Sequence, residues 1–128
     1  MIETTGVYHT SIPADDIDRA ERFYTEVLGM QLDSRVGRKG SQIVRLRCGP
    51  DAVVLFERPR ALGRDSHKED GVYHQSFEMD IDAFDEAVER MKKLGNFHQI
   101  TERDSGRTLY YWDTEGNYQE LHASRPQS

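Results

Sequence analysis

The chain of 128 residues is acidic, with 23 Asp and Glu against 17 Lys and Arg and a formal net charge of −6 at pH 7. This balance argues against a nucleic-acid partner, because phosphate binding needs clustered Lys and Arg. Cys48 is the single cysteine, no apolar run is long enough to cross a bilayer, and the N-terminus lacks the pattern of a signal peptide, so we expect one cytoplasmic domain over residues 1–128 with no membrane partner.

In chain order, the first expected element is a strand at the tetrapeptide GVYH, residues 6–9. A helix should follow, because apolar residues then recur at helical spacing behind an N-cap at Asp15 or Asp16. Gly29 stands where a glycine ends a helix. Three strands separated by turn residues come next, at residues 30–36, 41–48 and 52–57.

The second half of the chain repeats this order of elements. GVYH returns at residues 71–74, and a second helical pattern follows, with an N-cap at Asp80 or Asp82 and a terminal glycine at Gly95. Three more strands are expected at residues 97–102, 108–112 and 118–123. Both halves therefore run strand, helix, strand, strand, strand.

The repeat predicts an α+β fold of two βαβββ modules related by a pseudo-twofold. The first module spans residues 6–58 and the second 71–124, with a polar linker at 59–70. Their curled sheets would form a cup-shaped mixed sheet with the helices outside. A cup lined by strand residues is a natural place for a small-molecule ligand or a metal ion.

Two histidines end the repeated tetrapeptides and occupy matching positions on the first strand of each module. Histidine is a frequent metal ligand, and His9 and His74 are therefore the first two candidates. Glu120 is the best third candidate, because a carboxylate among strand hydrophobes is costly to bury unless it is paired or bound to a metal. Two histidines and one carboxylate form the facial triad of non-haem iron, and the set also suits Mn, Zn or Ni.

The repeat offers a check on the number of ligands. The interval from His74 to Glu120, counted from His9, reaches Leu55, so the counterpart of Glu120 is apolar. By the same counting, Glu57 is the counterpart of His122. The site would then have three protein ligands and open positions for substrate, water or dioxygen.

The sequence resembles the vicinal oxygen chelate superfamily, which includes glyoxalase I, fosfomycin-resistance and bleomycin-resistance proteins and extradiol dioxygenases. The resemblance covers nearly the whole chain, and its markers are both GVYH copies, FYTEVLGM at residues 23–30 and DTEGNYQE at residues 113–120. It implies metal ligands at His9, His74 and Glu120. It also implies a homodimer in which His9 comes from one chain and the other two ligands from its partner.

Within this superfamily, extradiol dioxygenases carry a motif of the form L-Y-x-x-D-P-x-G-x-x-x-E. LYYWDTEG at residues 109–116 and Glu120 fit this motif, with Thr114 in place of proline. The resemblance implies an extradiol-dioxygenase-like enzyme acting on a small vicinal-oxygen substrate, with Fe(II) favoured over Mn, Zn or Ni. Tyr110 falls where these enzymes have a tyrosine that hydrogen-bonds the bound catecholate, so we expect it to be catalytic.

Other functions stay open. Fosfomycin-type thiol transferases share the three ligands and the tyrosine, and Thr108 and Ser11 fit hydroxyl positions near their phosphonate site. A glyoxalase-type lyase needs a fourth carboxylate, which Glu57 would have to supply. A bleomycin-type protein would sequester a planar drug in the cup without catalysis. His67 in the linker and His122 beyond Glu120 are further candidates for residues around the substrate or behind the ligands.

Overall fold

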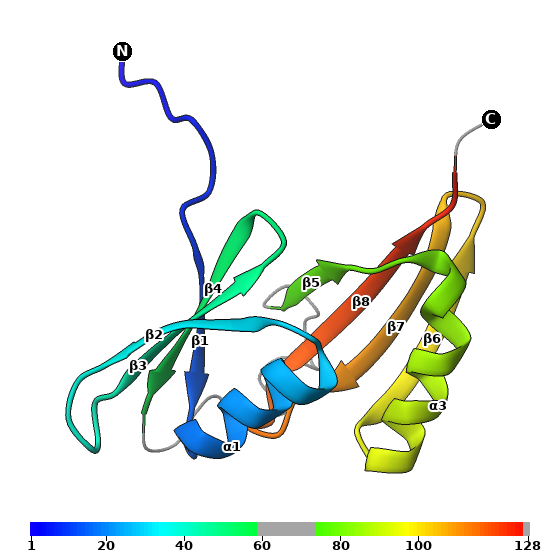
Figure 1. Ribbon diagram of the computed structural model, residues 1–128. Coiled ribbons are helices and arrows are strands. Elements are labelled where there is room, and N and C mark those ends of the chain that lie inside the picture. The colour runs from blue at the N-terminus through cyan, green and yellow to red at the C-terminus, as the bar shows by residue number, and fades with distance from the viewer. Residues whose placement is uncertain (59–73, 127–128) are drawn as a thin grey trace. The chain divides into compact units, whose positions relative to one another are not determined.

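The computed structural model describes residues 1–58 and 74–126 (Figure 1). The chain divides into two compact units, Met1–Ala61 and Leu62–Ser128, and each is described by itself. The expected linker at 59–70, with His67, lies outside the described residues. No helix in the described ranges is long and apolar enough to cross a membrane.

The first unit is a four-stranded mixed sheet with one helical segment. Its elements are β1 (Thr10–Ala14), α1 (Ile17–Arg22), the π-helical turn η1 (Phe23–Val27), β2 (Gln31–Val36), β3 (Ile43–Cys48) and β4 (Asp51–Glu57). The strand order is β1-β4-β3-β2, with β1 parallel to β4 and the other neighbours antiparallel. A parallel first strand is what a βαβββ unit requires, because the helix carries the chain back to the starting end of the sheet.

The second unit repeats this arrangement. Its elements are β5 (Gln75–Glu78), the 3₁₀ turn η2 (Ile81–Ala83), α3 (Phe84–Leu94), β6 (Phe97–Arg103), β7 (Gly106–Trp112) and β8 (Tyr118–Ser124). The strand order is β5-β8-β7-β6, with β5 parallel to β8. The predicted α+β fold of two βαβββ modules is confirmed.

The residues predicted to begin and end the helices form the expected caps. The Asp16 carboxylate accepts a hydrogen bond from the backbone N–H of Arg19 at 3.0 Å, and Asp80 accepts one from Asp82 at 2.9 Å. Gly95 ends α3 with φ +80, a left-handed conformation in which a Cβ would be strained. The first helix finishes in the π-helical turn η1, where the Leu28 N–H bonds the Phe23 carbonyl at 3.2 Å.

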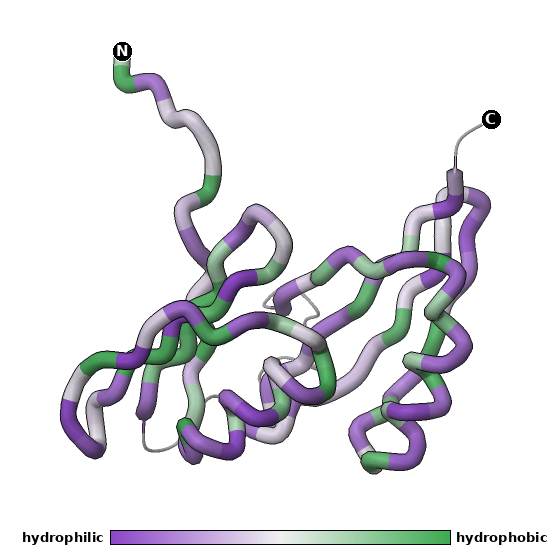
Figure 2. Tube along the Cα trace, in the orientation of Figure 1, coloured by the Kyte–Doolittle hydropathy of each residue, from purple (hydrophilic) through white to green (hydrophobic). Residues whose placement is uncertain are grey.

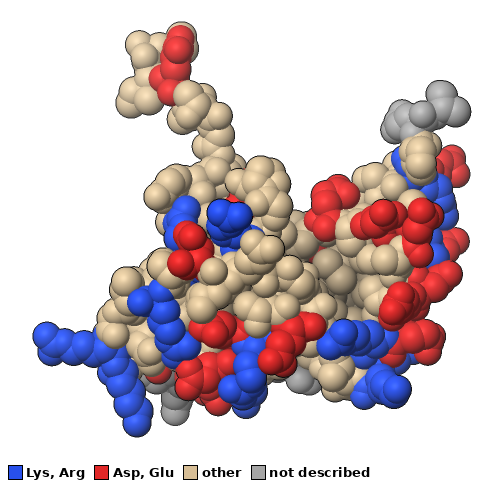
Figure 3. Space-filling view, viewed as in Figure 1, with Lys and Arg blue, Asp and Glu red and all other residues tan. Residues whose placement is uncertain are grey.

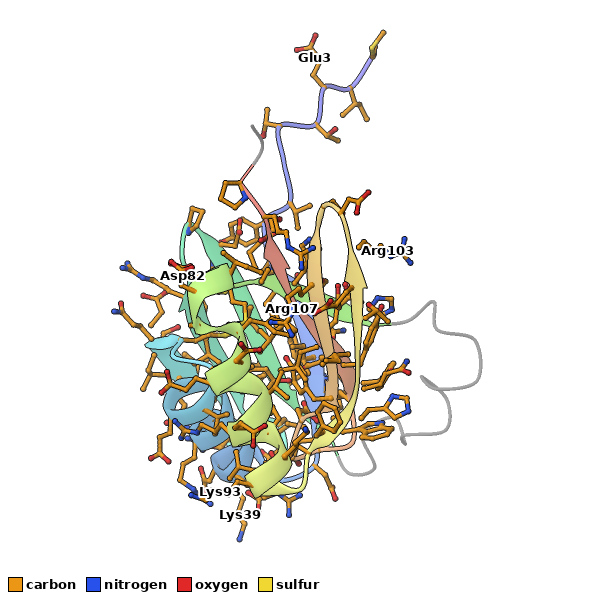
Figure 4. All side chains as sticks on the ribbon, turned by 90° about the vertical axis from the view of Figure 1, so that its right-hand side faces the viewer. Glu3, Lys39, Asp82, Lys93, Arg103 and Arg107 are labelled. Atoms are coloured by element: carbon orange, nitrogen blue, oxygen red, sulfur yellow. The ribbon has the colours of Figure 1, made fainter. Side chains whose placement is uncertain are left out.

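Each sheet buries one face against its own helix, and green apolar positions alternate with polar ones along several strands in Figure 2. In the second unit Leu109 and Tyr111 are fully buried, and α3 packs on β6 and β7. Arg107 lies on this helix-facing side (Figure 4), with its guanidinium 4.2 Å from the centroid of the Phe84 ring. The alternation leaves Thr108, Tyr110 and Trp112 on the opposite face, where each is half-buried.

Two local features differ from the sequence-based expectation. His9 and His74 each stand one residue before the first strand of their unit, which begins at Thr10 and at Gln75. Both second strands carry a β-bulge at the same point, between Leu32 and Ser34 and between Phe97 and Gln99. The internal repeat therefore extends to an irregularity that the residue pattern does not show.

On the face shown in Figure 3, Lys and Arg side chains are interspersed with Asp and Glu. In the first unit the guanidinium of Arg35 pairs with Asp18 and with Glu21, the latter at 2.9 Å. In the second unit Arg107 pairs with Asp85 at 2.8 Å and with Glu102 at 2.7 Å. Basic side chains on these elements are thus engaged with carboxylates of their own unit.

Candidate functional site

The second unit brings two of the three predicted metal ligands together. Nε2 of His74 lies 3.2 Å from Oε2 of Glu120, and the side chains are 27% and 17% exposed. Strand β5 runs parallel to β8 with Ser76 in register with Glu120, so the residue that precedes β5 comes beside the first residues of β8. The pair is therefore fixed by the parallel pairing of two strands that are far apart in the sequence.

The distance between these two atoms suits a shared metal ion. Metal–nitrogen and metal–oxygen bonds are about 2.0–2.2 Å, so two such ligands at right angles stand roughly 3 Å apart. Nδ1 of His74 is buried and has no hydrogen-bond partner among the described residues, and Nδ1 of His9 shares this property. The donor set and its geometry fit a divalent cation.

His9, the third predicted ligand, belongs to the first unit. Its ring contacts Tyr8 at a centroid distance of 5.5 Å, and the Arg45 guanidinium lies 4.9 Å from the centre of the Tyr8 ring. Across residues 1–58 and 74–126 no three His, Cys, Asp or Glu side chains form a group that could hold a metal ion. The geometric support for a metal site therefore rests on His74 and Glu120.

The strand registers correct the expected counterpart of Glu120. Ser76 pairs with Glu120 in the second unit, and Ser11 pairs with Val54 in the first, so Val54 rather than Leu55 corresponds to Glu120. The last two strands are joined by one more residue in the second unit, because Arg47 pairs with Ala52 whereas Trp112 pairs with Tyr118. Val54 is apolar and 4% exposed, so the predicted absence of a fourth carboxylate at this position holds.

The same registers show that Glu57 is not the counterpart of His122. The residue of the first unit that corresponds to His122 is Phe56. Oε1 of Glu57 accepts hydrogen bonds from the backbone N–H groups of Gly40 at 2.8 Å and Gln42 at 3.0 Å. The Gln42 N–H bond is the largest cause that lowers the pKa of Glu57. Burial opposes it, and the bonds from the Gly40 N–H and the Gln42 side chain and the charge of Arg35 lower the pKa further. Glu57 therefore holds the loop between β2 and β3.

Among the other predicted residues, those of the second unit can be placed beside the pair. Tyr110 on β7 is in register with Glu120 on β8, and residues directly opposite one another on antiparallel strands share a face. One step along the same face, Oγ1 of Thr108 lies 3.0 Å from Nδ1 of His122. Ser11 is exposed on β1, in the first unit. His67 lies outside the described residues.

A group of four rings, His98, Tyr110, Trp112 and Tyr118, lies beside the His74–Glu120 pair; we call it the ring cluster. Tyr118 is central to it, with its ring centroid 5.9 Å from that of Tyr110 and 5.4 Å from those of Trp112 and His98. Nδ1 of His98 lies 2.7 Å from the Tyr118 hydroxyl. The sequence reasoning did not identify His98, Trp112 or Tyr118 as site residues.

Burial of the Tyr118 side chain raises its pKa, and the neighbouring Tyr110 and Glu120 raise it further, while a hydrogen bond with the Gln99 side chain acts in the opposite direction. The strand alternation could have identified Trp112 and Tyr118, because each is an even number of residues from Tyr110 or Glu120 on its own strand. No spacing rule could have identified His98, because it lies in the β-bulge of β6.

The motif DTEGN at residues 113–117 forms the turn that aligns β7 with β8. Oδ1 of Asp113 accepts hydrogen bonds from the backbone N–H groups of Glu115 and Asn117, each at 2.8 Å. Gly116 takes φ +85, which only glycine adopts without strain. Thr114 follows Asp113 at the turn position where proline is common, because proline has the φ value needed there. Thr114, which stands where the dioxygenase motif has proline, therefore occupies a position in this turn.

The chain is similar to several proteins of known structure. A glyoxalase/bleomycin resistance protein/dioxygenase domain from Frankia sp. EAN1pec is 25% identical with a TM-score of 0.80, over 98% of this chain and 96% of that one. The fosfomycin resistance protein FosX from Listeria monocytogenes is 21% identical with a TM-score of 0.75, over 96% of both chains. FosX from Mesorhizobium loti is 24% identical with a TM-score of 0.71, over 98% and 94%.

A variant of the Listeria FosX has been crystallised with Mn(II) and 1S,2S-dihydroxypropylphosphonic acid. No curated protein sequence matches the chain. The model of one protein family matches residues 6–121, a range that includes His9, His74, Tyr110 and Glu120. The chain belongs to the Glyoxalase/Bleomycin resistance protein/Dioxygenase superfamily.

Proposed function

We propose that the protein is a metal-dependent enzyme that acts on a small substrate through two adjacent substrate oxygens. His74 and Glu120 would hold a divalent cation, with His9 as the third ligand. The observation that carries this proposal is the 3.2 Å separation of His74 Nε2 and Glu120 Oε2 in a half-buried setting. Three protein ligands would leave coordination positions for a bidentate substrate.

The residues around the pair would bind and orient that substrate. A divalent metal would supply Lewis acidity and neutralise negative charge on the two substrate oxygens. The Tyr110 hydroxyl, on the face that carries Glu120, would donate a hydrogen bond to an oxygen on which charge develops. The ring cluster would keep water away from one side of the reacting group, because its members are buried or half-buried.

For the reaction itself, an extradiol-dioxygenase-like activity with Fe(II) is our first candidate. The motif at residues 109–120 supports it, because Tyr110 and Glu120 lie directly opposite one another as neighbouring strand residues. Aromatic rings gathered on the same face also suit a flat substrate such as a catecholate, which would bind through both of its oxygens.

A fosfomycin-type reaction is the second candidate, and the Listeria FosX favours it. That protein shares the fold, and a variant of it was crystallised with Mn(II) and a dihydroxypropylphosphonic acid, a diol with two adjacent oxygens. Thr108 would then serve as a hydroxyl near the substrate, with Ser11 as its candidate in the first unit. Glyoxalase-type lyase chemistry has less support, because Glu57 is engaged by the backbone of its own loop.

We also propose a homodimer whose site is shared between chains, with His9 from one chain and the other two ligands from its partner. The internal repeat supports this, because each βαβββ unit offers one sheet face opposite its helix. Light scattering of the purified protein at micromolar concentration would test it. A mass of one chain at every concentration would exclude it.

Metal content and activity together test the proposed function. The purified protein should hold close to one equivalent of divalent metal per chain, and His74→Ala should lose it. With Fe(II) and air, a panel of catechols should give yellow ring-cleavage products. With Mn(II), an epoxide phosphonate should add water to give a diol or, when a thiol is supplied, add the thiol to give an adduct. Metal binding without either reaction would favour another lyase or transferase. No metal, combined with tight binding of a planar drug, would instead indicate a sequestering protein.

A further inference from the structure

The ring cluster has two properties that a purely structural core would not need. Its rings lie on the face of the second sheet opposite helix α3, as the alternation of Leu109 and Tyr111 with Tyr110 and Trp112 shows. His98, Tyr110 and Trp112 are only half-buried, so part of each ring surface is accessible.

The cluster is also held in one arrangement by specific contacts. Tyr118 is 7% exposed, its ring is nearly parallel to that of Tyr110 at 16°, and its hydroxyl lies 2.7 Å from Nδ1 of His98. The His98 ring in turn lies 4.8 Å from that of Trp112. The β-bulge at His98 directs this side chain onto the cluster, which is a recognised use of bulges beside functional sites.

We propose that the ring cluster determines substrate specificity: the accessible faces of Tyr110 and Trp112 receive a flat, unsaturated ring of the substrate, and His98 is a positioning residue that fixes the cluster through Tyr118. This inference rests on the proposed function, because it places the ring of the substrate beside the oxygens that the metal would bind. It does not depend on which reaction follows.

The register limits how the substrate can lie. Tyr110 is directly opposite Glu120, and Trp112 is directly opposite Tyr118, the β8 residue level with His74, so the two accessible rings lie along β7 at the levels of the two proposed ligands. Same-face neighbours on a strand are about 7 Å apart. A flat ring that extends from the chelating oxygens across β8 towards β7 would therefore meet Tyr110 on the Glu120 side and Trp112 on the His74 side, and a larger fused ring would cover more of both.

Three hydroxamates separate ring recognition from metal binding. Acetohydroxamate, benzohydroxamate and cyclohexanecarbohydroxamate chelate metals through the same two adjacent oxygens and differ in carrying a methyl group, a flat ring or a ring that is not flat. Their affinities for the Zn(II)-loaded protein would be measured by titration calorimetry, because Zn(II) has no redox chemistry. Trp112 is the single tryptophan, so quenching of its fluorescence reports directly on the cluster.

We expect benzohydroxamate to bind roughly tenfold more tightly than the other two, since stacking on one aromatic side chain has about this effect. Trp112→Leu and His98→Ala should reduce this preference to less than about threefold while leaving the affinity for acetohydroxamate unchanged. His98→Asn, which keeps a hydrogen-bonding group near the Nδ1 position, should restore much of it. Phe97→Leu is the matched control, because Phe97 is in register with the fully buried Tyr111, outside the ring cluster.

Equal affinities for the three hydroxamates would overturn the inference and leave the proposed function standing. A benzohydroxamate preference that survives both Trp112→Leu and His98→Ala would overturn it as well. Failure of acetohydroxamate to bind in the presence of Zn(II) would instead mean that the metal site, and with it the proposed function, is wrong. Thermal melting of each variant shows whether the variant is folded, and His98→Asn provides the test if His98→Ala does not fold.

Discussion

Nε2 of His74 lies 3.2 Å from Oε2 of Glu120, although these residues come from the two ends of the second unit. The parallel pairing of β5 with β8 brings them together, and the turn at Asp113 sets the register of β8 against β7. The candidate site thus depends on two features remote from it, a parallel strand pair and a hairpin turn.

The first prediction concerns that turn. Asp113→Ala should destabilise the protein by about 2–3 kcal/mol, because it leaves the N–H groups of Glu115 and Asn117 buried without their acceptor. Asp113 is 1% exposed, so water cannot replace the carboxylate. Urea unfolding of wild type and variant would measure the change. Asp104→Ala, at an exposed turn between β6 and β7, is the control and should cost less than about 0.5 kcal/mol.

The second prediction concerns pH and Glu57. The folded protein lowers the pKa of this carboxyl, mainly through the N–H groups of Gln42 and Gly40. Its contribution to stability is therefore present above the unfolded pKa, which is about 4.3, and is lost as the pH falls through the folded value. Glu57→Gln should lower the melting temperature at pH 7, and its effect should be smaller at about pH 3.

Glu3→Gln is the control for that experiment, since Glu3 lies exposed in the N-terminal segment (Figure 4). It should change the melting temperature at neither pH. If Glu57→Gln destabilised the protein equally at both pH values, the ionised carboxylate would not be the form that holds the loop, and the account of Glu57 would be wrong.

The third prediction separates binding from chemistry at Tyr110. Tyr110→Phe removes the hydroxyl and keeps the ring that stacks on Tyr118. Metal affinity should stay within about twofold of wild type, because the metal ligands are His74 and Glu120 and the hydroxyl is not one of them. Turnover of whichever substrate is identified should fall by about 10²–10³, the usual cost of losing one donor to a developing oxyanion. Unchanged turnover would show that Tyr110 acts only through its ring.

Much of the fold could be predicted from residue patterns. The helix cap at Asp16 and the glycine stop at Gly95 depend on local physics, and the structure contains both, whereas residues 71–73 of the second GVYH lie outside the described residues. His74 and Glu120 could be selected as partners because buried carboxylates and strand histidines need compensation. These predictions required only periodicity, capping and burial cost.

The remaining features depended on register and on a bulge, which local patterns do not encode. One extra residue in the turn after Trp112 moves the counterpart of Glu120 from Leu55 to Val54, and a shift of one residue moves a side chain to the other face of a strand. Leu55 accordingly belongs to the fully buried core. The bulge that directs His98 toward Tyr118 leaves no mark in the spacing of apolar residues.

The central claim is that Glu120 and His74 hold one divalent cation, and Zn(II) titration calorimetry tests it most directly. Wild type should bind one equivalent per chain, and Glu120→Gln should weaken that binding at least a hundredfold, or about 2.7 kcal/mol. Glu78→Gln, which changes a carboxylate of β5 that lies near Ser124, should bind as wild type does. Equal Zn(II) affinity in wild type and Glu120→Gln would contradict the account.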